Sequence, residues 1–538
     1  MLWDAIVVGA GHNGLTAAAY LGKAGLRTLV LERAPVVGGA AISEEFHPGY
    51  RNSVASYTVS LLRPEVIADL DLPRHGYRTI PYSGALRLFA DGRTLFTDGD
   101  PAHDRAAIGR FSNRDYDNLE RFYAMIQRVG AVVRAQWLAE PPDLGGGFLE
   151  LLSLLKAGRE ARALTPELRH FLLQLFTTSA NAIVDRWLDS EAIRNEVAAH
   201  CVSGNFASLD QPGSAIPFFH HALGEFEGRR GSWGLVRGGM GRISDAMAAA
   251  ACEAGVEIRT GAPIARILIE GGRAAGVRLE SGEEIRAHTV LSNADPKRTF
   301  LGLVGEEHLD PSFAADIRHI RMGHASLRMN LALSAAPEFA HVDTADAAAA
   351  LGASVVMFPD RATLEANYRT ALAGGIPAEP YVNLVIPSAL DDSLAPPGHH
   401  VMSLLCKYFP YRLAGGESWD RIGGRVADGI LAKLERHIPN LRRITVARQL
   451  LTPLDIERRF GLTEGDIFHG RHDLDQILSL RPHPAAARYR TPVPGLYLCG
   501  SGSHPGGGVS GAPGRNAARR VMRDFGRRPR SRAARGRA

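Results

Sequence analysis

The feature that most constrains this chain is a glycine-rich turn between an apolar run and an alanine-rich segment near the N-terminus. Residues 5–8 form the apolar run, and the alanine-rich segment continues until Gly25. The three glycines of the turn are Gly9, Gly11 and Gly14. This G-x-G-x-x-G spacing between a strand and a helix is typical of dinucleotide binding, because it allows a tight turn, close approach of a pyrophosphate and close helix packing. The phosphates would lie at the helix N-terminus, beside His12 and Asn13.

A second predicted strand, residues 28–31, ends in an acidic residue eighteen positions after the last glycine. The carboxylate of Glu32 can accept hydrogen bonds from both hydroxyls of an adenosine ribose, which disfavours a ligand with a 2′-phosphate. Arg33 follows, and then a second glycine pair in the run Gly38-Gly39-Ala40-Ala41. In flavoproteins with two dinucleotide-binding domains, the chain passes under the FAD pyrophosphate at this point. The sequence therefore predicts FAD rather than NAD.

Length and composition are those of a globular protein with more than one domain. With 538 residues, two interleaved domains are the expected arrangement. We find no apolar run long enough for a transmembrane helix, and the fold is expected to begin at residue 4, which leaves no room for a signal peptide. The cytoplasm is the expected compartment, unless an organelle presequence has been cleaved.

The net charge of +5 is concentrated at the C-terminus. Residues 519–538 hold nine arginines and a single acid, so the rest of the chain is slightly acidic and no nucleic-acid partner is expected. Residues 526–538 lack core-forming side chains and are predicted to be a disordered basic tail. We interpret this tail as a solubilising end. The alternative is a peripheral, electrostatic contact with an anionic membrane surface.

Cysteine usage narrows the chemistry further. The four cysteines are scattered, and no C-x-x-C pair occurs. This distribution argues against a disulfide framework, a zinc site and a redox-active dithiol, and we predict no metal site.

The middle of the chain contains a hairpin, a helical insertion and a return to β-structure. Residues 85–97 alternate around Asp91-Gly92, which predicts a hairpin of residues 86–89 with 94–97. Residues 113–174 have apolar side chains at three-and-four spacing, which indicates helices, and an insertion of this kind usually caps a substrate cavity. Residues 256–295 are predicted strands, and the strand that starts at Ile264 would bring backbone groups to adenine.

A further glycine-rich stretch, residues 234–241, has the spacing G-G-x-G and lacks a long strand before it. We predict that it is a tight loop that opens a helix, rather than a second cofactor site. Residues 300–450 alternate strands with helices and contain no motif that we would assign to a function.

A second glycine-dense segment lies close to the C-terminus. A predicted buried strand, residues 496–498, leads into it. Ser510 is predicted to cap a helix that has Pro513 in its first turn. Such a helix would direct its N-terminus at the flavin N1 and C2 carbonyl, where it would stabilise the negative charge that reduction adds. The cofactor-binding candidates here are Gly500, Ser501, Gly508, Val509 and Gly511.

These segments together resemble the phytoene-desaturase-like FAD oxidoreductases, over about residues 4–525. The resemblance is carried by the opening glycine motif, by residues 38–41, by the run Ser292-Asn293-Ala294-Asp295-Pro296, and by two C-terminal stretches. The first of these runs from Phe468-His469-Gly470 to Arg481-Pro482, and the second spans residues 496–516. The H-P-G-G-G motif at residues 504–508 is the most specific part. Asn293 becomes a cofactor-binding candidate through this resemblance.

The resemblance implies an α/β fold with one non-covalent FAD. The implied fold consists of a Rossmann-type FAD-binding domain, similar to those of glutathione reductase and the amine oxidases, and of an inserted α+β substrate domain with a helical cap. We expect residues 1–70, 232–300 and 485–525 in the FAD-binding domain, and residues 71–231 and 301–484 in the substrate domain. Eukaryotic relatives are mitochondrial, so a eukaryotic source would imply that compartment instead of the cytoplasm.

The function implied by the resemblance is removal of hydride from a C–H bond of an apolar, polyene or lipid-like small molecule. The electrons would pass to oxygen, a quinone or another carrier rather than to NAD(P), since no second G-x-G-x-x-G occurs. If a base is required, His469 and His504 are the candidates; the alternative is that each is hydrogen-bonded to loop backbone. Two other functions stay open: redox-neutral isomerisation or hydration on bound FAD, and a non-catalytic, FAD-bearing interaction protein.

Overall fold

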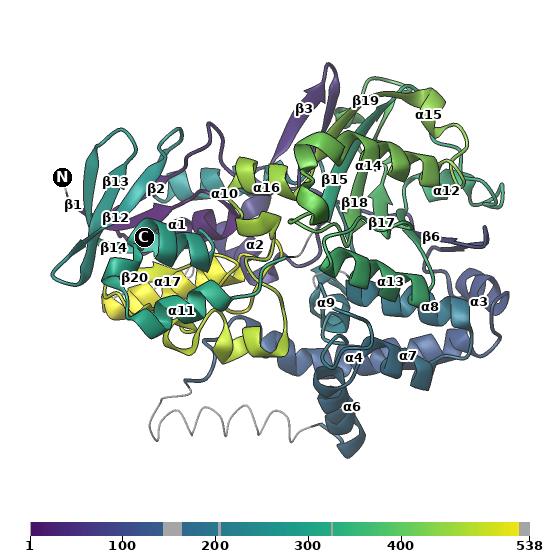
Figure 1. Ribbon diagram of the computed structural model, residues 1–538, viewed down its shortest axis with the longest axis horizontal. Coiled ribbons are helices and arrows are strands. Elements are labelled where there is room, and N and C mark those ends of the chain that lie inside the picture. Colours follow the sequence, from purple (N-terminus) through teal and green to yellow (C-terminus); the bar gives the residue numbers. More distant parts are fainter. Residues whose placement is uncertain (1, 144–163, 203–205, 324–325, 527–538) are drawn as a thin grey trace, which may run out of the picture.

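The computed structural model describes residues 2–143, 164–202, 206–323 and 326–526. Figure 1 shows two mixed α/β halves side by side, each built on its own seven-stranded sheet, with a group of helices below the second. The elements β1 and α17, from the two ends of the described chain, both belong to the first half, which is therefore completed around an insertion.

The first sheet has the strand order β11-β2-β1-β14-β13-β12, and β20 also pairs with β14. Five of its strands run parallel, as in a Rossmann-type sheet, while β12 and β13 add an antiparallel meander. The strands are β1 Leu2–Val8, β2 Thr28–Leu31, β11 Glu257–Arg259, β12 Ile264–Glu270, β13 Arg273–Leu279, β14 Glu284–Ser292 and β20 Leu496–Leu498. The strand predicted at residues 28–31 and the β-structure predicted over residues 256–295 are therefore confirmed.

Helices cover both faces of this sheet. One apolar cluster joins it to α1 (His12–Lys23), α10 (Gly241–Glu253) and α17 (Ala512–Asp524). A second cluster joins the other face to a π-helical turn (Arg298–Val304) and to α11 (Pro311–His319). Because these last two elements pack on the first sheet, this half extends beyond the boundary expected at residue 300.

The second sheet has the order β19-β15-β18-β17-β16-β6-β7 and is antiparallel except where β16 meets β6. Its strands are β6 Ala85–Phe89, β7 Thr94–Thr97, β15 Ser326–Leu333, β16 Ser354–Phe358, β17 Val382–Val385, β18 His400–Lys407 and β19 Thr445–Leu451. β6 and β7 form the predicted hairpin. One face of the sheet is apolar and packs against α14, Trp419–Leu434.

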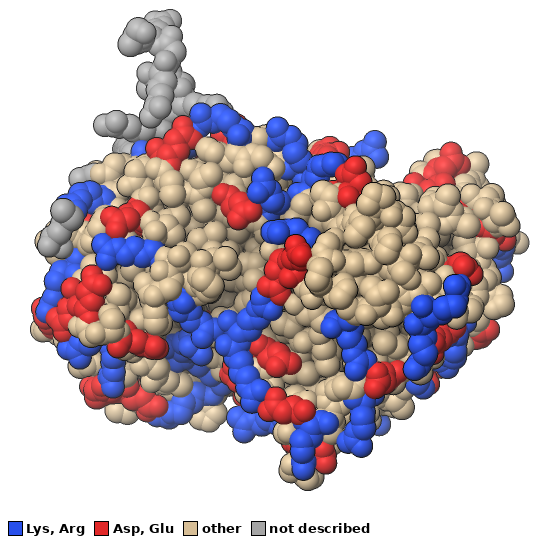
Figure 2. Space-filling view, turned by 90° about the horizontal axis from the view of Figure 1, so that it is seen from above, with Lys and Arg blue, Asp and Glu red and all other residues tan. Residues whose placement is uncertain are grey.

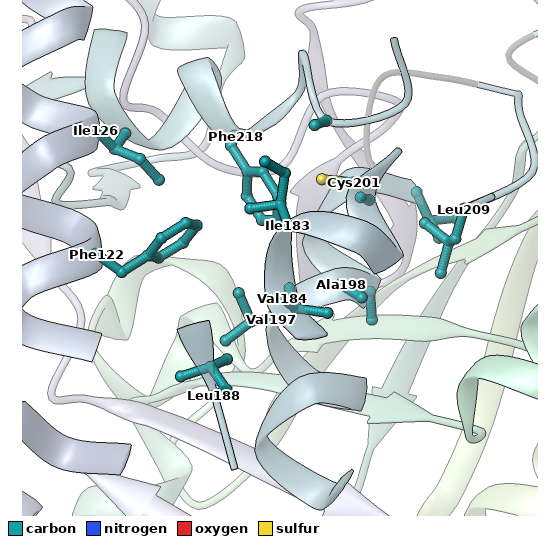
Figure 3. Close-up of a cluster of buried hydrophobic side chains, with 14 of the residues drawn as sticks. Phe122, Ile126, Ile183, Val184, Leu188, Val197, Ala198, Cys201, Leu209 and Phe218 are labelled. Atoms are coloured by element: carbon teal, nitrogen blue, oxygen red, sulfur yellow. The ribbon is translucent and has the colours of Figure 1, made fainter. Parts of the chain in front are cut away.

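A helical cap covers the opposite side of this half (Figure 1). The residues predicted to form an apolar stripe do so on α4, where Phe122, Ile126 and Val129 are buried. The ring of Phe122 meets those of Phe171 and Phe218 edge-on, and these contacts join α4 to α6 and α9. Figure 3 shows Phe122 and Phe218 within this apolar cluster. The cap helices are α3 Pro101–Gly109, α4 Asp115–Trp137, α6 Pro166–Thr177, α7 Ala180–Trp187, α8 Glu191–Ala199 and α9 Phe218–Leu223.

The glycine-rich stretch at residues 234–241 is a short strand and a loop that opens α10, as predicted. The backbone N–H groups of Met240 and Gly241 donate to the hydroxyls of Ser53 and Ser43 at 3.0 Å. The start of α10 is thus bonded to neighbouring protein hydroxyls. The remaining elements are β3 Ser43–His47, β4 Tyr50–Ser53, α2 Pro64–Leu70, β5 Thr79–Pro81, β8 Glu225–Phe226, β9 Arg229–Arg230, β10 Gly234–Val236, α12 Ala347–Leu351, α13 Arg361–Leu372, α15 Leu441–Ile444 and α16 Pro453–Phe460.

The surface carries both signs of charge in close alternation. On the face shown in Figure 2, acidic and basic side chains are interspersed and separated by uncharged areas. Within the described residues, no helix combines the length and hydropathy that a membrane span needs. Residues 144–163 of the predicted helical insertion, and the predicted basic tail apart from Gly526, lie outside the described residues.

Candidate functional site

The first glycine motif forms a tight turn that exposes the start of α1. Gly9 has a φ of +92°, and a Cβ on Gly14 would lie 2.2 Å from the carbonyl oxygen of Gly9. Both positions therefore require glycine. Gly11 is the N-cap of α1, and in the described chain no side chain bonds to the first-turn N–H groups. These groups and the helix dipole form a ready site for phosphate oxygens beside His12 and Asn13.

Glu32 follows β2 directly and lies against the turn. Its two carboxylate oxygens accept hydrogen bonds from the N–H groups of Ala10 (2.8 Å) and Ala34 (2.9 Å). These bonds fix the carboxylate and leave lone pairs for ribose hydroxyls. Arg33 is turned elsewhere: its guanidinium donates to the carbonyls of Arg458 and Arg459 at the end of α16. Its side chain is therefore engaged by α16 rather than by the turn.

The chain that enters β12 lies beside Glu32. The N–H of Ala262 donates to the carbonyl of Glu32 at 2.8 Å, and the N–H of Gly261 donates to Ala34. The segment leading to Ile264 therefore runs beside Glu32, whose carboxylate would bind the ribose. This is where the sequence predicted backbone contact with adenine.

The second glycine pair extends the cradle away from the phosphates. The N–H of Gly38 donates to Ala10 at 2.8 Å, and Gly38 also bridges to Gly11. A Cβ on Gly39 would lie 3.4 Å from the Cα of Gly11. Beyond this pair, the carbonyl of Ala40 accepts from Ser56, and that of Ala41 accepts from Ser244. Residues 38–42 thus lead from the phosphate turn to the segment Ser53–Tyr57.

The C-terminal glycine loop meets the N-terminal turn directly. Asn13 donates to the hydroxyl of Ser501 at 3.2 Å, and His12 Nε2 lies 3.2 Å from the carbonyl oxygen of Gly508. A Cβ on Gly514 would come within 2.0 Å of the carbonyl oxygen of Asn13, so α17 and α1 touch at their N-termini. The two glycine segments predicted to share one site, almost five hundred residues apart in the sequence, are brought together.

Asn293 joins the two glycine segments. Its N–H donates to Val8 at 2.9 Å, and a Cβ on Gly11 would come within 2.8 Å of its side-chain nitrogen. A Cβ on Gly500 would come within 2.6 Å of its carbonyl oxygen. Asn293 therefore holds the end of β14 between the phosphate turn and the loop at residue 500.

The start of α17 differs from the prediction in its capping residue. Gly511, with φ +71°, is the N-cap, and Ser510 instead accepts from the N–H of Ala512 at 3.2 Å. A left-handed conformation at the cap suits glycine, which explains why the serine stands one position earlier. Pro513 lies in the first turn as predicted. Without a capping side chain, the N–H groups near Gly508 and Val509 can face a ligand.

The three histidines of the site are neutral near pH 7. Burial lowers the pKa of His12, His469 and His504 to about 4 in each case. His504 Nε2 lies 3.0 Å from the carbonyl oxygen of Gln136, while the Nδ1 atoms of His469 and His504 are buried without a hydrogen-bond partner in the described chain. A catalytic role for either histidine stays a prediction.

Arg481 fixes the loops that carry these histidines. Its buried guanidinium donates to the carbonyls of Phe468 (2.6 Å), Ser501 (2.9 Å) and Arg471 (3.0 Å). Burial lowers the pKa of Arg481 to about 10, so it stays charged at neutral pH. Asp466 accepts from the N–H groups of Phe468 and Gly470. The segment at residues 466–471 and the glycine loop are thus held as one rigid unit.

A second buried arginine lies behind the segment Ser53–Tyr57. Arg328 on β15 is 1% exposed, and it donates to the hydroxyl of Ser403 (2.7 Å) and the carbonyl of Leu404 (2.8 Å). Its guanidinium lies 4.8 Å from the ring centre of Tyr57 and contacts the carbonyl of Val54. Within the described residues, no carboxylate makes an ion pair with Arg328. Burial lowers its pKa to about 10, so a positive charge lies one layer behind the cofactor cradle.

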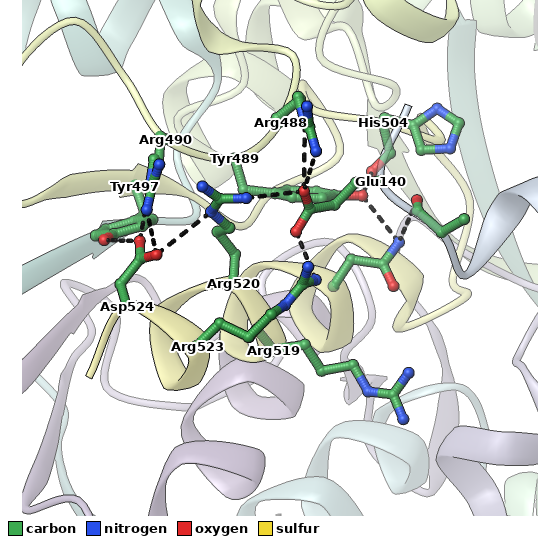
Figure 4. Close-up of polar contacts among 12 residues, drawn as sticks. Glu140, Arg488, Tyr489, Arg490, Tyr497, His504, Arg519, Arg520, Arg523 and Asp524 are labelled. Atoms are coloured by element: carbon green, nitrogen blue, oxygen red, sulfur yellow. Dashed lines mark hydrogen bonds and ion pairs between the residues drawn. The ribbon is translucent and has the colours of Figure 1, made fainter. Parts of the chain in front are cut away.

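The end of the cap is clamped to α17. Glu140, just after α4, accepts hydrogen bonds from Arg488, Arg520 and Arg523, and Figure 4 shows the three guanidinium groups around its carboxylate. Asn516 of α17 also donates to the carbonyl of Trp137 at 3.0 Å. The cap is therefore fixed to the helix whose N-terminus closes the cofactor cradle.

Two cavities open beside this cradle. The larger, of about 940 Å³, lies between the second sheet and α4 and is lined by Tyr57, Tyr123 and Asn383, among others. The smaller is lined mainly by apolar side chains of the cap, together with His504 and Gly507 of the glycine loop. Both border segments that would hold the flavin, since Tyr57 lines the larger cavity and His504 and Gly507 line the smaller.

Several of these residues were not predicted as site residues. Arg328, Tyr123, Asn383 and Glu140 belong to no motif. A signal for Arg328 is present, because Ser326–Leu333 alternates polar and small residues with Leu and Met, as expected for a strand with one apolar face. That alternation shows which face is polar but not what the face adjoins.

The residues present fit FAD. Two uncapped helix N-termini, two glycine segments without room for a Cβ, and a carboxylate positioned for a ribose converge on one elongated cradle. Residues 7–70 match the family described as NAD(P)-binding Rossmann-like domain, and residues 97–326 match Flavin containing amine oxidoreductase.

Known relatives resemble the chain over nearly its whole length. Pyridine nucleotide-disulfide oxidoreductase domain-containing protein 2 of Rattus norvegicus is 39% identical, covering 97% of this chain and 94% of the relative. One of the limonene dehydrogenase subunits of Castellaniella defragrans is 28% identical, with 97% and 95% covered. Phytoene desaturase (lycopene-forming) of a Paracoccus species is 29% identical, with 95% of each chain covered.

Solved structures support the fold. An oxidoreductase from Methanosarcina mazei superposes with a TM-score of 0.62 at 17% identity, covering 97% of this chain and all of that one. A triple mutant of putrescine oxidase gives 0.63 at 16% identity, with 97% and 98% covered. The predicted fold class and the FAD cofactor are confirmed, and the protein is an FAD-dependent oxidoreductase. The chain belongs to the family of FAD-dependent oxidoreductases that includes pyridine nucleotide-disulfide oxidoreductase domain-containing protein 2 and, at lower identity, the phytoene desaturases.

Proposed function

We propose that this enzyme removes hydride from a C–H bond of a largely apolar, isoprenoid-like small molecule. The observation that carries the proposal is the larger cavity, which has a volume of about 940 Å³ and is lined by Tyr57 and Thr58 next to the cradle. The smaller cavity, of about 80 Å³, adds apolar walls of Trp137, Phe176 and Phe219 beside His504 of the glycine loop. An apolar molecule bound there would lie beside the cofactor cradle. Bound FAD supplies the hydride acceptor, while the protein orients the substrate and excludes water.

The names of two relatives support this substrate class. Limonene and phytoene, for which a dehydrogenase and a desaturase are named, are both isoprenoid hydrocarbons. These relatives cover nearly the whole chain, including the cap that lines the smaller cavity. Loss of hydride to the flavin leaves a carbocation, which must also lose a proton from a neighbouring carbon to form a double bond. The neutral imidazoles of His469 and His504, whose Nδ1 atoms have no hydrogen-bond partner in the described chain, are the groups that would accept this proton.

We propose oxygen or a quinone as the electron acceptor. The sequence has one G-x-G-x-x-G motif, and the cradle built from it accounts for FAD. The second glycine-rich stretch is packed against Ser43 and Ser53, which leaves its backbone donors engaged. NAD(P) would need another dinucleotide site.

The experiment is anaerobic mixing of oxidised holoenzyme with three isoprenoids: limonene, phytoene carried in detergent, and the alcohol geraniol. Bleaching of the flavin absorbance, followed by its recovery with oxygen or a soluble quinone, is the expected result. Product formation that occurs only after the flavin has been reduced beforehand, without net electron flow, would contradict the proposal and favour redox-neutral isomerisation.

A further inference from the structure

The second sheet has one apolar face and one polar face, and both are buried. Along β15, Leu327, Met329 and Leu331 belong to the apolar core under α14. Arg328 and Asn330 point the other way, yet they are 1% and 0% exposed. In an antiparallel sheet with alternating polarity, the polar face usually meets water. Here the cap and the segment Ser53–Tyr57 (the cofactor segment) cover it, so its polar groups need partners inside the protein or on a ligand.

The pairing register shows how this face is laid out. Arg328 lies opposite Leu405, Leu405 opposite Asn383, Asn383 opposite Val356, and Val356 opposite Arg87. Residues opposite one another share a face. The row therefore crosses four strand spacings, about 19 Å, from the cofactor segment to the cap. The larger cavity lies along it, since Tyr57, Asn383, Val356 and Arg87 all line that cavity.

The charged groups at the far end of the row are paired. Arg87 donates to the buried carboxylate of Glu196 at 3.0 Å, which compensates both charges. Near the cofactor end, the hydroxyl of Tyr82 donates to Thr58 at 2.9 Å. These groups need no charged partner from a ligand.

Three neutral groups in the same cavity do have unused hydrogen-bonding capacity. Within the described residues, no protein group bonds to the hydroxyl of Tyr57 or Tyr123. The side chain of Asn383 makes one hydrogen bond, from its Nδ2 to Tyr381 at 3.4 Å, which leaves its carbonyl oxygen and a second N–H for a ligand. Burial raises the pKa of Tyr57 to about 12, so its hydroxyl stays protonated and can donate.

We infer that the substrate carries one neutral oxygen-bearing group, a hydroxyl or a carbonyl, on its apolar skeleton, and that Asn383 binds this group together with Tyr57 or Tyr123. This inference rests on the proposed function and specifies its substrate further. A plain hydrocarbon in the larger cavity would leave these three groups without partners, and sites built to hydrogen-bond a substrate oxygen strongly reject analogues that lack it. An anion would find Arg87 already paired with Glu196, while the exposed Arg229 and Arg230 share the cavity lining with the carboxylates of Asp98, Glu120 and Glu227.

Three ten-carbon probes of one skeleton type test this inference: geraniol (alcohol), myrcene (hydrocarbon) and geranic acid. Each is titrated into oxidised holoenzyme, and binding is followed by perturbation of the flavin spectrum and by calorimetry. We expect geraniol to bind at least tenfold more tightly than myrcene and geranic acid. Because no flavin reduction is needed, this result is independent of whether the proposed oxidation occurs.

The variants Asn383→Leu and Tyr123→Phe localise the effect. Asn383→Leu is expected to weaken geraniol binding about tenfold and to leave myrcene binding unchanged. Tyr123→Phe removes only a hydroxyl, and it replaces Asn383→Leu in the binding measurement if that variant does not retain FAD. Asn113→Leu makes the same chemical change on an exposed residue and is the control. Equal or tighter binding of myrcene or geranic acid, no measurable binding of geraniol, or an unchanged ratio in both cavity variants would overturn the inference.

Discussion

At the scale of single residues, Arg328 places a fixed positive charge behind the segment Ser53–Tyr57, which would lie beside a bound flavin. It is buried, it stays charged at neutral pH, and in the described chain no carboxylate pairs with it. A buried cation stabilises negative charge nearby, and two-electron reduction adds negative charge to a flavin. We predict that Arg328→Met lowers the flavin midpoint potential by roughly 30 mV or more, a tenfold loss in the reduction equilibrium. Equilibrium titration with a reference dye measures it.

The control separates charge from hydrogen bonding. Arg328→Lys keeps the positive charge but loses part of the contact with Ser403 and Leu404. Its potential should stay near that of the parent enzyme, while its stability falls as in Arg328→Met. A potential that falls equally in both variants would mean that Arg328 only holds the segment Ser53–Tyr57 in place.

Residues whose role follows from local chain geometry were predictable from the sequence. Gly9, Gly14 and Glu32 could be assigned because a tight turn and a strand end fix their positions relative to a dinucleotide. Asn383 and Arg328 could not, because their role arises from strands that pair across long sequence separations. Nothing in the local pattern shows that their face of the sheet is covered by the cofactor segment and the cap.

At the scale of elements, the clamp around Glu140 joins α4 to α17. The carboxylate is 7% exposed as a side chain and receives hydrogen bonds from three arginines, of which Arg520 is also largely buried. Glu140→Gln removes the charge and leaves these arginines without their shared partner. We expect a loss of about 3 kcal/mol in the free energy of unfolding, the low end of the range for a buried ion pair, because Arg523 is mostly exposed. Urea denaturation of the holoenzyme measures it, and the same change at the exposed Asp117, Asp117→Asn, should have no comparable effect.

The helices and strands that the sequence predicts correctly are those in which one periodic pattern of apolar residues determines the buried face. The stripe of Phe122, Ile126 and Val129 placed α4 correctly, and the alternation around Asp91-Gly92 placed the hairpin. The start of α17 was placed one residue early, because serine is the commoner cap and only the backbone conformation shows that Gly511 takes that position. The packing of residues 298–319 on the first sheet also depends on tertiary contacts that no local signal records.

At the scale of the whole molecule, the buried histidines of the cofactor site should make the fold sensitive to acid. His12, His469 and His504 have pKa values lowered to about 4 by burial, whereas histidine in an unfolded chain titrates near 6.5. Between these values the unfolded chain binds protons that the folded chain does not, so stability is full above pH 6.5 and is lost as pH falls toward 4. Each histidine contributes about 3 kcal/mol to that loss. All three lie where the N-terminal turn, the glycine loop and the cap meet, so their protonation would weaken contacts between the two ends of the chain.

We predict that the free energy of unfolding, measured with urea in steps from pH 7 to 4.5, falls steeply below pH 6 and that FAD is released over the same range. In His504→Gln, the slope of the free energy of unfolding against pH should correspond to uptake of about one proton fewer on unfolding. The change His319→Gln, at an exposed histidine, should leave this slope unaltered. A stability that is constant across this range would mean that the histidines protonate in the folded state without cost.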